Sequence, residues 1–363
     1  MKVAIVHEWL TIYGGSERVV EQILKIFPDA DIYTTVYNEK NMGSIFPKEK
    51  VHTSFMQKIP FSQKYYTKML HLMPKAFESF DLSKYDLVIS SSTSCAKGVL
   101  TSAETLHISY VHTPMRYAWD LYHDYLKESG FITRMAMKKI LPKIRMWDAL
   151  SSLRVDKFIA NSTIVQKRIQ KVYRRESEVI YPPVNTDFFV PNNKESEDFY
   201  MILSRLIPYK KVDLAIKACN KLQKKLIILG SGPQEKYLKS IAGPTIEFTG
   251  RLNDEESRDY YQRCKAFLFP GYEDFGITPV EAQACGKPVI AYGKGGALDS
   301  VIEGVTGVFF SEQTVDSFIQ GIHDFETRTF DAREIRLHAE KYSNEEFIGK
   351  MKKFIFQIRL KIS

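Results

Sequence analysis

Short apolar runs, each ending in a loop and most followed by a helix-compatible stretch, recur along this chain and constrain its fold more than any other feature. The run 2–9 breaks at Gly14 and Gly15, and the stretch 16–27 that follows has apolar residues at helical spacing. Similar runs occupy 85–92, 107–114 and 156–162. Strands that alternate with helices build a parallel sheet covered by helices. The first half of the chain is therefore predicted to be a doubly wound α/β domain.

A proline-rich segment, 179–198, divides the chain, because Pro182, Pro183 and Pro191 exclude regular helix and the residues after them are polar. Beyond it the pattern restarts with apolar runs at 199–206, 225–233, 245–252, 265–272 and 287–296. We predict two Rossmann-like domains, residues 1–182 and 183–342, with an amphipathic helix at 343–363, opened by a cap at Ser343, joined to the first. Two such domains facing each other would form a cleft lined by the carboxyl ends of both sheets, where ligands usually bind.

Composition excludes several classes of protein. The 363 residues are 44% hydrophobic and 26% charged, with neither a long uncharged apolar run nor a signal-peptide pattern, which predicts a cytoplasmic protein. The four scattered cysteines form no CxxC pair, so neither a disulfide framework nor a structural zinc is expected. The net charge of +8 predicts an anionic partner, and without a zinc-finger, KH or RRM signature nucleic acid ranks last among the candidates.

The stretch "EDFGITPVEAQACG", 273–286, holds the first candidate site, because an apolar strand ends just before it and a helix is expected to begin within it. The backbone N–H groups of residues 275–277 would lie at the helix N-terminus, which favours an anion, and Gly276 allows close approach of a ligand. Glu273 precedes the helix and Glu281 lies about one turn inside it, so both could bind hydroxyls of one sugar. The alternative for Glu281 is an ion pair on a solvated helix face.

Basic residues follow the neighbouring predicted strands. Arg205 and Lys210 come after the run 199–204 and before a helix near Val212, a placement that suits a diphosphate. "GSGP", 230–233, follows the next strand, and Gly232 is a candidate for a phosphate-binding turn, although such a turn is more often only structural. Arg251, after the run 245–250, joins the donor-binding candidates.

The first half has a glycine loop of its own, "TIYGGSERV", with Gly14 and Gly15. It matches neither GxGxxG nor a Walker motif, so a dehydrogenase or an NTPase is disfavoured. His112 follows an apolar strand and precedes a proline, so its side chain is expected at a loop, where it could bind substrate. Arg116 and Asp120 are near enough in sequence to orient His112 or to bind ligand, and the sequence leaves both open.

These residues together resemble the retaining GT-B glycosyltransferases of the large E-x7-E family, glycosyltransferase family 4. "EDFGITPVE" matches the E-x7-E motif, "SRLIPYK" the R-x4-K pattern, and "GGSE" the N-terminal glycine loop, and the likeness runs from Met1 into the last helix. "VHEWLTIYGGSERVV" with "YVHTPMRYAWD" is particularly similar to bacterial O-antigen mannosyltransferases, which use GDP-mannose. The resemblance implies an N-terminal acceptor domain and a C-terminal nucleotide-sugar domain.

The resemblance also assigns roles to individual residues. It implies that Glu273 contacts donor-sugar hydroxyls and that Glu281 holds the ribose. The remaining implied contacts are Arg205 and Lys210 with the diphosphate, the amides of Phe275, Gly276 and Ile277 with sugar and phosphate, Gly15 with the diphosphate, and His112 with the transferred sugar. Two positions depart from the family pattern: Ser204 and Lys211 stand where glycines are frequent, which leaves the loop shape, and the choice between Lys210 and Lys211 at the phosphate, open.

The chemistry of sugar transfer fits this set of residues. A leaving diphosphate gains negative charge, which Arg205, Lys210 and the helix end would stabilise. No DxD pair stands at a strand end, so we expect neither a metal ion nor any other cofactor. Front-face attack, in which the leaving phosphate takes the acceptor proton, is preferred to a double displacement, because Glu273 is expected to bind hydroxyls.

The acceptor is less well defined. The stretches 55–77 and 134–147 mix aromatic or aliphatic residues with lysine and arginine, a pattern that fits either an anionic bilayer surface or a core-packed helix with a solvated basic face. On the first alternative the acceptor is an undecaprenyl-diphosphate-linked saccharide, and the protein binds the inner face of the cell membrane. Other functions left open are a UDP-sugar-dependent glucosyl- or N-acetylglucosaminyltransferase, a GT-B-fold sugar-nucleotide epimerase, and a non-enzymatic nucleotide-sugar sensor.

Overall fold

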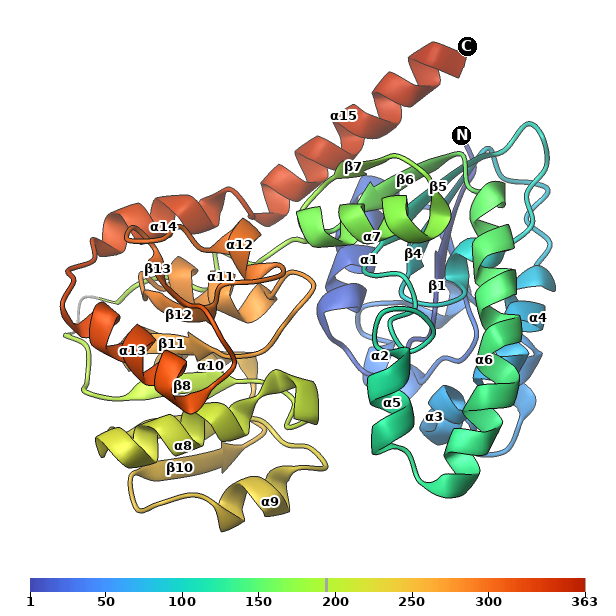
Figure 1. Cartoon of the computed structure of the whole chain (residues 1–363). Coiled ribbons are helices and arrows are strands. Elements are labelled where there is room, and N and C mark those ends of the chain that lie inside the picture. The colour runs from blue at the N-terminus through green and yellow to red at the C-terminus, as the bar shows by residue number, and fades with distance from the viewer. Residues whose placement is uncertain (193–194, 363) are drawn as a thin grey trace. The chain divides into compact units, whose positions relative to one another are not determined.

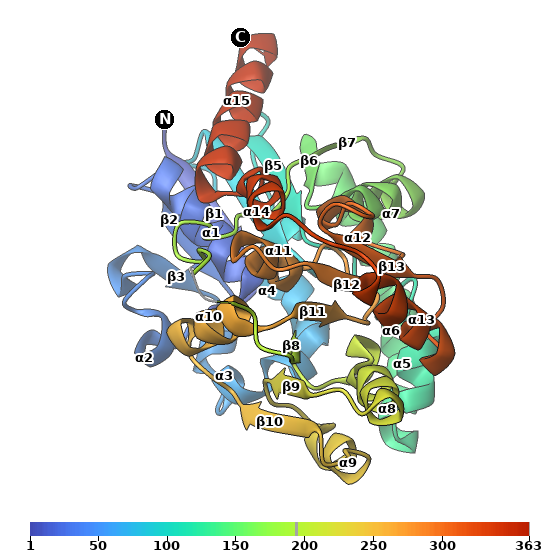
Figure 2. The same ribbon diagram turned by 90° about the vertical axis from the view of Figure 1, so that its left-hand side faces the viewer.

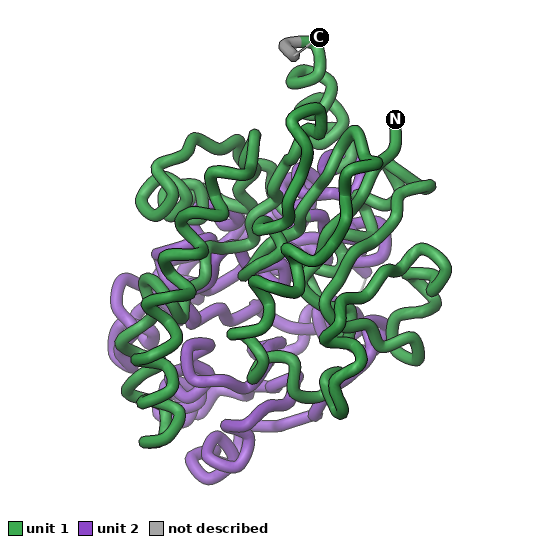
Figure 3. The backbone as a smooth tube through the Cα atoms, turned by 90° about the vertical axis from the view of Figure 1, so that its right-hand side faces the viewer, with its two compact units in different colours: residues 1–182, 348–363 green, residues 183–347 purple. Residues whose placement is uncertain are grey.

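The computed structural model describes residues 1–192 and 195–362, and it forms two compact units. Unit 1 is Met1–Pro182 with Ile348–Ser363, and unit 2 is Pro183–Phe347 (Figure 3). Residues 193 and 194 of the predicted linker, and the last residue of the predicted final helix, lie outside the described residues.

Unit 1 is built on a seven-stranded sheet in the order β3-β2-β1-β4-β5-β6-β7, in which every neighbouring pair is parallel. The strands are β1 (Val3–His7), β2 (Asp31–Thr34), β3 (Val51–Thr53), β4 (Leu87–Ser92), β5 (Leu106–Val111), β6 (Lys157–Ala160) and β7 (Ser177–Val179). Every residue of β1 and β4 is buried, as expected for strands covered on both faces, which explains their continuous apolar runs.

α-Helices and short 3-10 helices, labelled α and η, connect these strands (Figure 1). They are α1 (Gly15–Ile26), α2 (Glu39–Met42), η1 (Lys48–Lys50), η2 (Phe55–Lys58), α3 (Ser62–Tyr65), η3 (Tyr66–Leu72), α4 (Met73–Glu78), η4 (Ala96–Gly98), α5 (Tyr122–Glu128), α6 (Phe131–Ser151), η5 (Ser152–Arg154) and α7 (Thr163–Tyr173). Buried residues of α4 and α6, among them Phe77 and Leu141, pack with Val6 and Val88 of the sheet in one core cluster. The apolar stripe of α6 thus belongs to the core, and the helix continues through Pro142.

Unit 2 contains a six-stranded sheet in the order β10-β9-β8-β11-β12-β13, again with every neighbouring pair parallel (Figure 2). The strands are β8 (Tyr200–Leu203), β9 (Leu226–Leu229), β10 (Ile246–Gly250), β11 (Ala266–Phe269), β12 (Val289–Tyr292) and β13 (Gly307–Phe310). The helices are η6 (Pro208–Lys210), α8 (Val212–Leu222), α9 (Glu235–Ser240), α10 (Asp254–Arg263), α11 (Ile277–Ala284), α12 (Ala297–Ser300), α13 (Val315–Glu326) and α14 (Ala332–Glu340). Helices α8 and α13 pack on one face of the sheet through residues such as Ile216 and Phe318.

The last helix, α15 (Asn344–Ile362), begins where the sequence places it. The Ser343 hydroxyl accepts a hydrogen bond from the N–H of Glu346 at 3.2 Å, which is the expected cap. Met351 is fully buried and Ile358 nearly so, as the predicted apolar stripe requires. Among the described residues, no helix is long and apolar enough to cross a bilayer.

Both units therefore have Rossmann-like sheets. The two doubly wound domains of the predicted fold class, GT-B, are confirmed. In each sheet the strand order reverses once, between β1 and β4 in unit 1 and between β8 and β11 in unit 2. Such a switch point leaves the carboxyl ends of two adjacent strands uncovered by their connections, and ligands of open α/β sheets bind there.

Candidate functional site

The switch point of unit 2 brings together two of the residues singled out from the sequence. Lys210 lies in the loop after β8 and Glu273 in the loop after β11, and the Lys210 ammonium forms an ion pair with the Glu273 carboxylate. The side chains are 21% and 13% exposed. Burial opposes the charged form of Lys210, but the negative charge and hydrogen bond of Glu273, together with Tyr209 and Asp274, outweigh burial and raise the pKa of Lys210. The candidate cation and the candidate hydroxyl-binding acid therefore hold each other in this structure.

Glycines that the sequence analysis did not assign to the site support the Glu273 loop. The N–H of Gly296 donates to the carbonyl oxygen of Glu273 at 2.9 Å, and a Cβ on Gly296 would lie 2.2 Å from the Cα of Phe275. Gly271 is also closely packed, because a Cβ there would lie 3.2 Å from both Glu273 Oε1 and the Cα of Lys210. The paired glycines after the strand, "GKGG", were the available signal for this contact.

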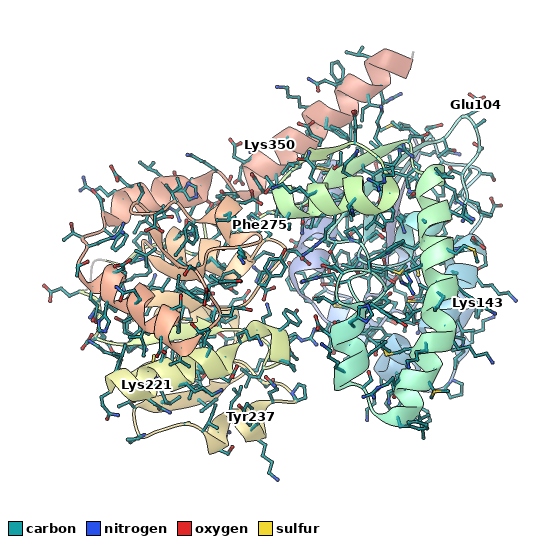
Figure 4. All side chains as sticks on the ribbon, in the orientation of Figure 1. Glu104, Lys143, Lys221, Tyr237, Phe275 and Lys350 are labelled. Carbon is teal, nitrogen blue, oxygen red and sulfur yellow. The ribbon has the colours of Figure 1, made fainter. Side chains whose placement is uncertain are left out.

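The N-terminus of α11 leaves backbone donors open beside this loop. Gly276 is the N-cap residue, with φ at 93°, and no side chain caps the helix. Among the described residues, none accepts a hydrogen bond from the N–H of Ile277 or Thr278. The side chain of Phe275, labelled in Figure 4, is buried and its ring lies 5.5 Å from that of Tyr342, so only its backbone is available to a ligand. Open N–H groups at a helix start favour an anion or a hydroxyl.

Glu281 does not lie on a solvated helix face. Its side chain is 4% exposed, and its carboxylate accepts a hydrogen bond from the Tyr261 hydroxyl at 3.0 Å. Burial, with the nearby negative charge of Glu281, raises the pKa of Tyr261. The alternative of a surface ion pair for Glu281 is therefore wrong, because α10 supplies a buried partner that the sequence spacing did not show.

Arg205 and Arg251 are both exposed, and neither forms a hydrogen bond or ion pair through its guanidinium with any described residue. Lys211 is exposed as well, and its φ of 54° places it in the left-handed region. This conformation explains why a glycine is common there in the family that the sequence resembles, since only glycine adopts it without strain. Of the two adjacent lysines, Lys210 is the one paired at the switch point.

Gly230 and Gly232 have packing roles of their own. A Cβ on Gly230 would lie 1.9 Å from the carbonyl oxygen of Ser204, and one on Gly232 would lie 2.5 Å from that of Leu206. The loop after β9 therefore lies against the loop after β8 at a distance that only glycine permits. This packing fixes the backbone that carries Arg205.

The switch point of unit 1 gathers four side chains into one chain of hydrogen bonds. His7 ends β1, Ser91 lies in β4, His112 follows β5, and Glu17 lies in the first turn of α1. The Glu17 carboxylate is 3.1 Å from His7 Nε2, His7 Nδ1 is 3.1 Å from Ser91 Oγ, and Ser91 Oγ is 2.8 Å from His112 Nε2. All four are buried, and only His112 was singled out from the sequence.

The two ends of this series of hydrogen bonds, His112 and Glu17, differ in charge. It lowers the pKa of His112 to about 3, with a smaller contribution from His7, so His112 is neutral at physiological pH. Burial opposes ionisation of Glu17, but its interactions with His7 and its further hydrogen bonds, including that from the Ser16 hydroxyl, together outweigh burial and lower the pKa of Glu17. Gly14, the N-cap of α1, approaches the same carboxylate, since a Cβ there would lie 3.2 Å from Glu17 Oε2. Gly15 is the first residue of the helix.

Arg116 and Asp120 make other contacts than with His112. Arg116 Nε is 3.4 Å and Arg168 Nε is 3.3 Å from the Asp120 carboxylate, while Arg168 also donates to the Thr113 hydroxyl. The contact that orients the ring of His112 comes instead from Ser91. Asp120 is thus the shared partner of two arginines, and it lies near the end of the loop between β5 and α5.

Glu8 is a second buried acid beside this site, and it is fully satisfied by the backbone. Its carboxylate accepts hydrogen bonds from the N–H groups after β4, at Thr93, Ser94, Cys95 and Ala96, over 2.6–3.1 Å. Glu8 therefore holds the loop after β4 against the end of β1. Within residues 1–192 and 195–362, no group of three or more His, Cys, Asp or Glu side chains is arranged to hold a metal ion, and all four cysteines are free and buried.

Comparison with known proteins places both units in one class. Residues 13–188 match the model of the family described as Glycosyltransferase Family 4, and residues 184–345 match that of Glycosyl transferases group 1. Both units therefore match glycosyltransferase domains, a family 4 domain followed by a group 1 domain.

Individual relatives match only part of this chain, at low sequence identity. The chain is 27% identical over 192 residues to the D-inositol 3-phosphate glycosyltransferase of Mycobacterium marinum, covering 46% of this chain and 41% of that protein. It is 30% identical over 176 residues to the GDP-mannose-dependent alpha-(1-6)-phosphatidylinositol monomannoside mannosyltransferase of Mycolicibacterium smegmatis, covering 40% of this chain and 46% of that protein. The matches thus span less than half the length of either relative.

A solved structure has the same fold over almost the whole length of this chain. The chain superposes on HepE of Anabaena in complex with UDP with a TM-score of 0.71 and 16% identity, covering 98% of this chain and all of that one. At this identity the likeness concerns the fold.

Proposed function

We propose that the protein is a retaining glycosyltransferase that transfers mannose from GDP-mannose to a lipid-linked acceptor in the synthesis of a bacterial surface glycan. The Lys210–Glu273 ion pair at the switch point of unit 2 carries the proposal. It places a cation and a carboxylate side by side at the edge where open α/β sheets bind ligands. A nucleotide sugar needs both: a cation for its diphosphate and an acceptor for its sugar hydroxyls.

Donor binding would exchange the partners of this pair. A diphosphate that takes the Lys210 ammonium leaves the Glu273 carboxylate without its cation, and the sugar hydroxyls then donate to it. Arg205 is exposed and its guanidinium is unpaired among the described residues, so it is available to a second phosphate oxygen. Each charged contact to the leaving group is expected to lower the barrier by about 3 kcal/mol, or on the order of a hundredfold in rate.

The two cationic side chains and the open start of α11 would stabilise the charge that develops on the leaving diphosphate. We therefore propose that transfer needs no divalent ion, and that activity is unchanged when EDTA is added. Glu273 is held by Lys210 and is the expected hydroxyl ligand, so we propose front-face attack without a glycosyl-enzyme. Mass-spectrometric detection of a sugar covalently bound to a carboxylate during turnover would contradict this mechanism.

Mannose is supported by the relative from Mycolicibacterium smegmatis, whose name states GDP-mannose as its donor. A UDP-sugar is the second candidate, because the similar solved structure from Anabaena contains UDP. Thermal shifts with GDP-mannose, UDP-glucose and UDP-N-acetylglucosamine rank the three, since a donor in excess of its Kd raises the apparent stability. We expect the largest shift with GDP-mannose in the unchanged protein and a loss of that shift in Arg205→Ala. Incubation with donor alone excludes an epimerase if the sugar nucleotide is recovered unchanged or only hydrolysed.

A membrane-borne acceptor is supported by the start of α6. Phe131, Ile132 and Met135 are 78%, 84% and 56% exposed, and Lys138 and Lys139 are exposed on the same helix. Exposed apolar residues beside lysines suit an anionic bilayer surface. We expect the protein to bind phosphatidylglycerol vesicles and to be released as salt rises, and the double variant Phe131→Ser, Ile132→Ser to bind them less. Equal binding of the double variant would contradict this part of the proposal.

A further inference from the structure

The hydrogen bonds that converge on His112 have a direction, and Glu17 sets it. A carboxylate can only accept, so His7 Nε2 must carry a proton and donate to it. If His7 carries one ring proton, its Nδ1 is an acceptor and takes the Ser91 O–H, which lies 3.1 Å away. Ser91 Oγ then accepts from His112 Nε2 at 2.8 Å. The second ring nitrogen of His112, Nδ1, is left as an acceptor.

The opposite direction requires a second buried charge. If His7 carried both ring protons, its Nδ1 would donate to Ser91, Ser91 would donate to His112 Nε2, and His112 Nδ1 would become a donor. This places an imidazolium where His7 is 1% exposed, in addition to the Glu17 carboxylate. With one proton on each bond, every linking atom has a partner and Glu17 is the single charge in the chain. Fewer buried charges favour the first direction.

The elements fix each member of the chain in place. His7, Ser91 and His112 come from the carboxyl ends of three adjacent strands, β1, β4 and β5, and His7 pairs in register with Ser91 (Figure 1). Glu17 is held by α1, and its other oxygen accepts from the Ser16 hydroxyl at 3.0 Å. Ser91 is fully buried and His112 is 9% exposed, which makes His112 the most exposed of the four residues.

We propose that Glu17, His7 and Ser91 are positioning residues that fix the ring and tautomer of His112, so that its Nδ1 accepts a hydrogen bond from a hydroxyl of the transferred sugar. This rests on the proposed function, under which His112 contacts that sugar. A neutral histidine with the other tautomer carries its proton at Nδ1. It would donate to the sugar hydroxyl instead of accepting a hydrogen bond from it. The chain from Glu17 selects between these two forms, and it does so before substrate binds.

The test is a measurement of the His112 tautomer, with a matched control on the same strand. Ser91→Ala removes the linking hydroxyl. Ser90→Ala is the control, because Ser90 is equally buried and bonds a different histidine, His107 Nε2, at 3.0 Å. The chain has only eight histidines, so 15N-histidine labelling and long-range 1H–15N correlation spectra can resolve each ring in the free protein. His112 is assigned from the peak lost in His112→Gln.

In the unchanged protein we expect His112 Nε2 to be protonated and Nδ1 to be bare. Ser91→Ala should give a mixture of tautomers at His112, and Ser91→Thr, which keeps the hydroxyl, should restore the original form. Ser90→Ala should alter the signals of His107 and leave those of His112 in place. A protonated Nδ1 in the unchanged protein, or an unaltered tautomer in Ser91→Ala, overturns the proposal.

Kinetics complete the test. We expect Ser91→Ala to lower kcat on the order of a hundredfold with a smaller change in KM, and Ser91→Thr to recover most of it. Ser90→Ala should leave both parameters within about twofold, judged against its thermal stability. Unchanged kcat in Ser91→Ala, with an altered tautomer, overturns the role in transfer. Absence of transferase activity in the unchanged protein would instead refute the proposed function, while the spectra would still decide whether the chain sets the tautomer.

Discussion

Replacement of Glu273 by glutamine separates the role of the Lys210–Glu273 pair in stability from its role in transfer. The substitution keeps the size and shape of the side chain and removes its negative charge. Lys210 then remains 21% exposed without the carboxylate that faces it in this structure. Glu273 itself is 13% exposed, so the pair is neither fully buried nor a surface pair.

The expected loss of stability follows from this intermediate exposure. Breaking a fully buried pair costs about 3–5 kcal/mol, and a hydrogen bond to a charged group contributes about 1.5–3 kcal/mol. Because both side chains retain some contact with water, we expect the lower range, about 1–2 kcal/mol. For a domain of this size the Tm falls by roughly 2–4 °C for each kcal/mol. Loss of a sugar contact should lower kcat/KM on the order of a hundredfold, which corresponds to about 2.7 kcal/mol.

Glu326→Gln is the matched control. Glu326 is 23% exposed and accepts hydrogen bonds from the ammonium groups of Lys224 and Lys265 and from the Tyr200 hydroxyl, at 2.7, 3.2 and 2.9 Å. Tyr200 begins β8, so this cluster lies at the amino end of the strand and away from the switch point. We expect the control to lose a similar amount of stability with unchanged kcat/KM.

Thermal unfolding and initial rates with saturating acceptor measure both quantities on the same preparations. If Glu273→Gln matches the unchanged protein in Tm and in kcat/KM, the pair has neither role and the argument for the donor site fails. If both variants lose turnover to the same extent, the loss reflects stability rather than the site.

Three further predictions concern features other than the Lys210–Glu273 pair. Burial opposes ionisation of Glu326, but its donors outweigh this and lower its pKa to about 2, so the stability that it contributes is present above about pH 4.5 and is lost as the pH falls towards 2. The difference in unfolding free energy between the unchanged protein and Glu326→Gln, about 1–2 kcal/mol after solvent screening, should vanish over that window in pH-dependent urea titrations. Lys211→Gly should raise the free energy of unfolding by up to about 1 kcal/mol, because it relieves the left-handed φ, and Gln223→Gly, with φ at 53°, should do the same at the end of α8; a loss of stability in both by calorimetry would refute this account of the strain. Asp148→Asn should lower the free energy of unfolding by about 3–5 kcal/mol in denaturant titrations, because the Lys97 side chain is 1% exposed and pairs with Asp148. The double variant Lys97→Met, Asp148→Asn should lose less, and a double variant that is less stable than the single one would contradict the explanation.

The sequence allowed the fold, and the position of the candidate site at the edge of the second sheet, to be predicted because both follow from local patterns. Short apolar runs that end at glycine or at polar residues define strands, and residues just after them lie at the carboxyl edge of a parallel sheet. Lys210 and Glu273 were placed correctly at that edge for this reason. Their mutual contact was not predicted, because it depends on β8 and β11 being neighbours, which strand order alone decides.

The residues missed in unit 1 show the limit of the same method. His7 and Ser91 are 84 positions apart in the sequence, and each lies in a run whose other members are simply buried. A single histidine at the end of an apolar strand is more often structural than functional, and no local pattern distinguishes the two. Only the pairing of β1 with β4 brings these residues together and gives the glutamate of "GGSE" a partner.

The two switch points solve one physical problem in different ways. At each, polar side chains at uncovered strand ends need partners in the absence of ligand. In unit 2 the partners are a lysine and a glutamate that a ligand with both phosphates and hydroxyls can separate, each charge exchanging one partner for another. In unit 1 the partners are two histidines and a serine that are linked by hydrogen bonds to one buried carboxylate. His112, at the other end of this series, is its most exposed member. An ion pair can be opened without leaving either charge bare, whereas a hydrogen-bonded chain transmits its direction only while it stays closed. The side chains of unit 2 are therefore suited to exchange partners on binding, and those of unit 1 to remain as they are.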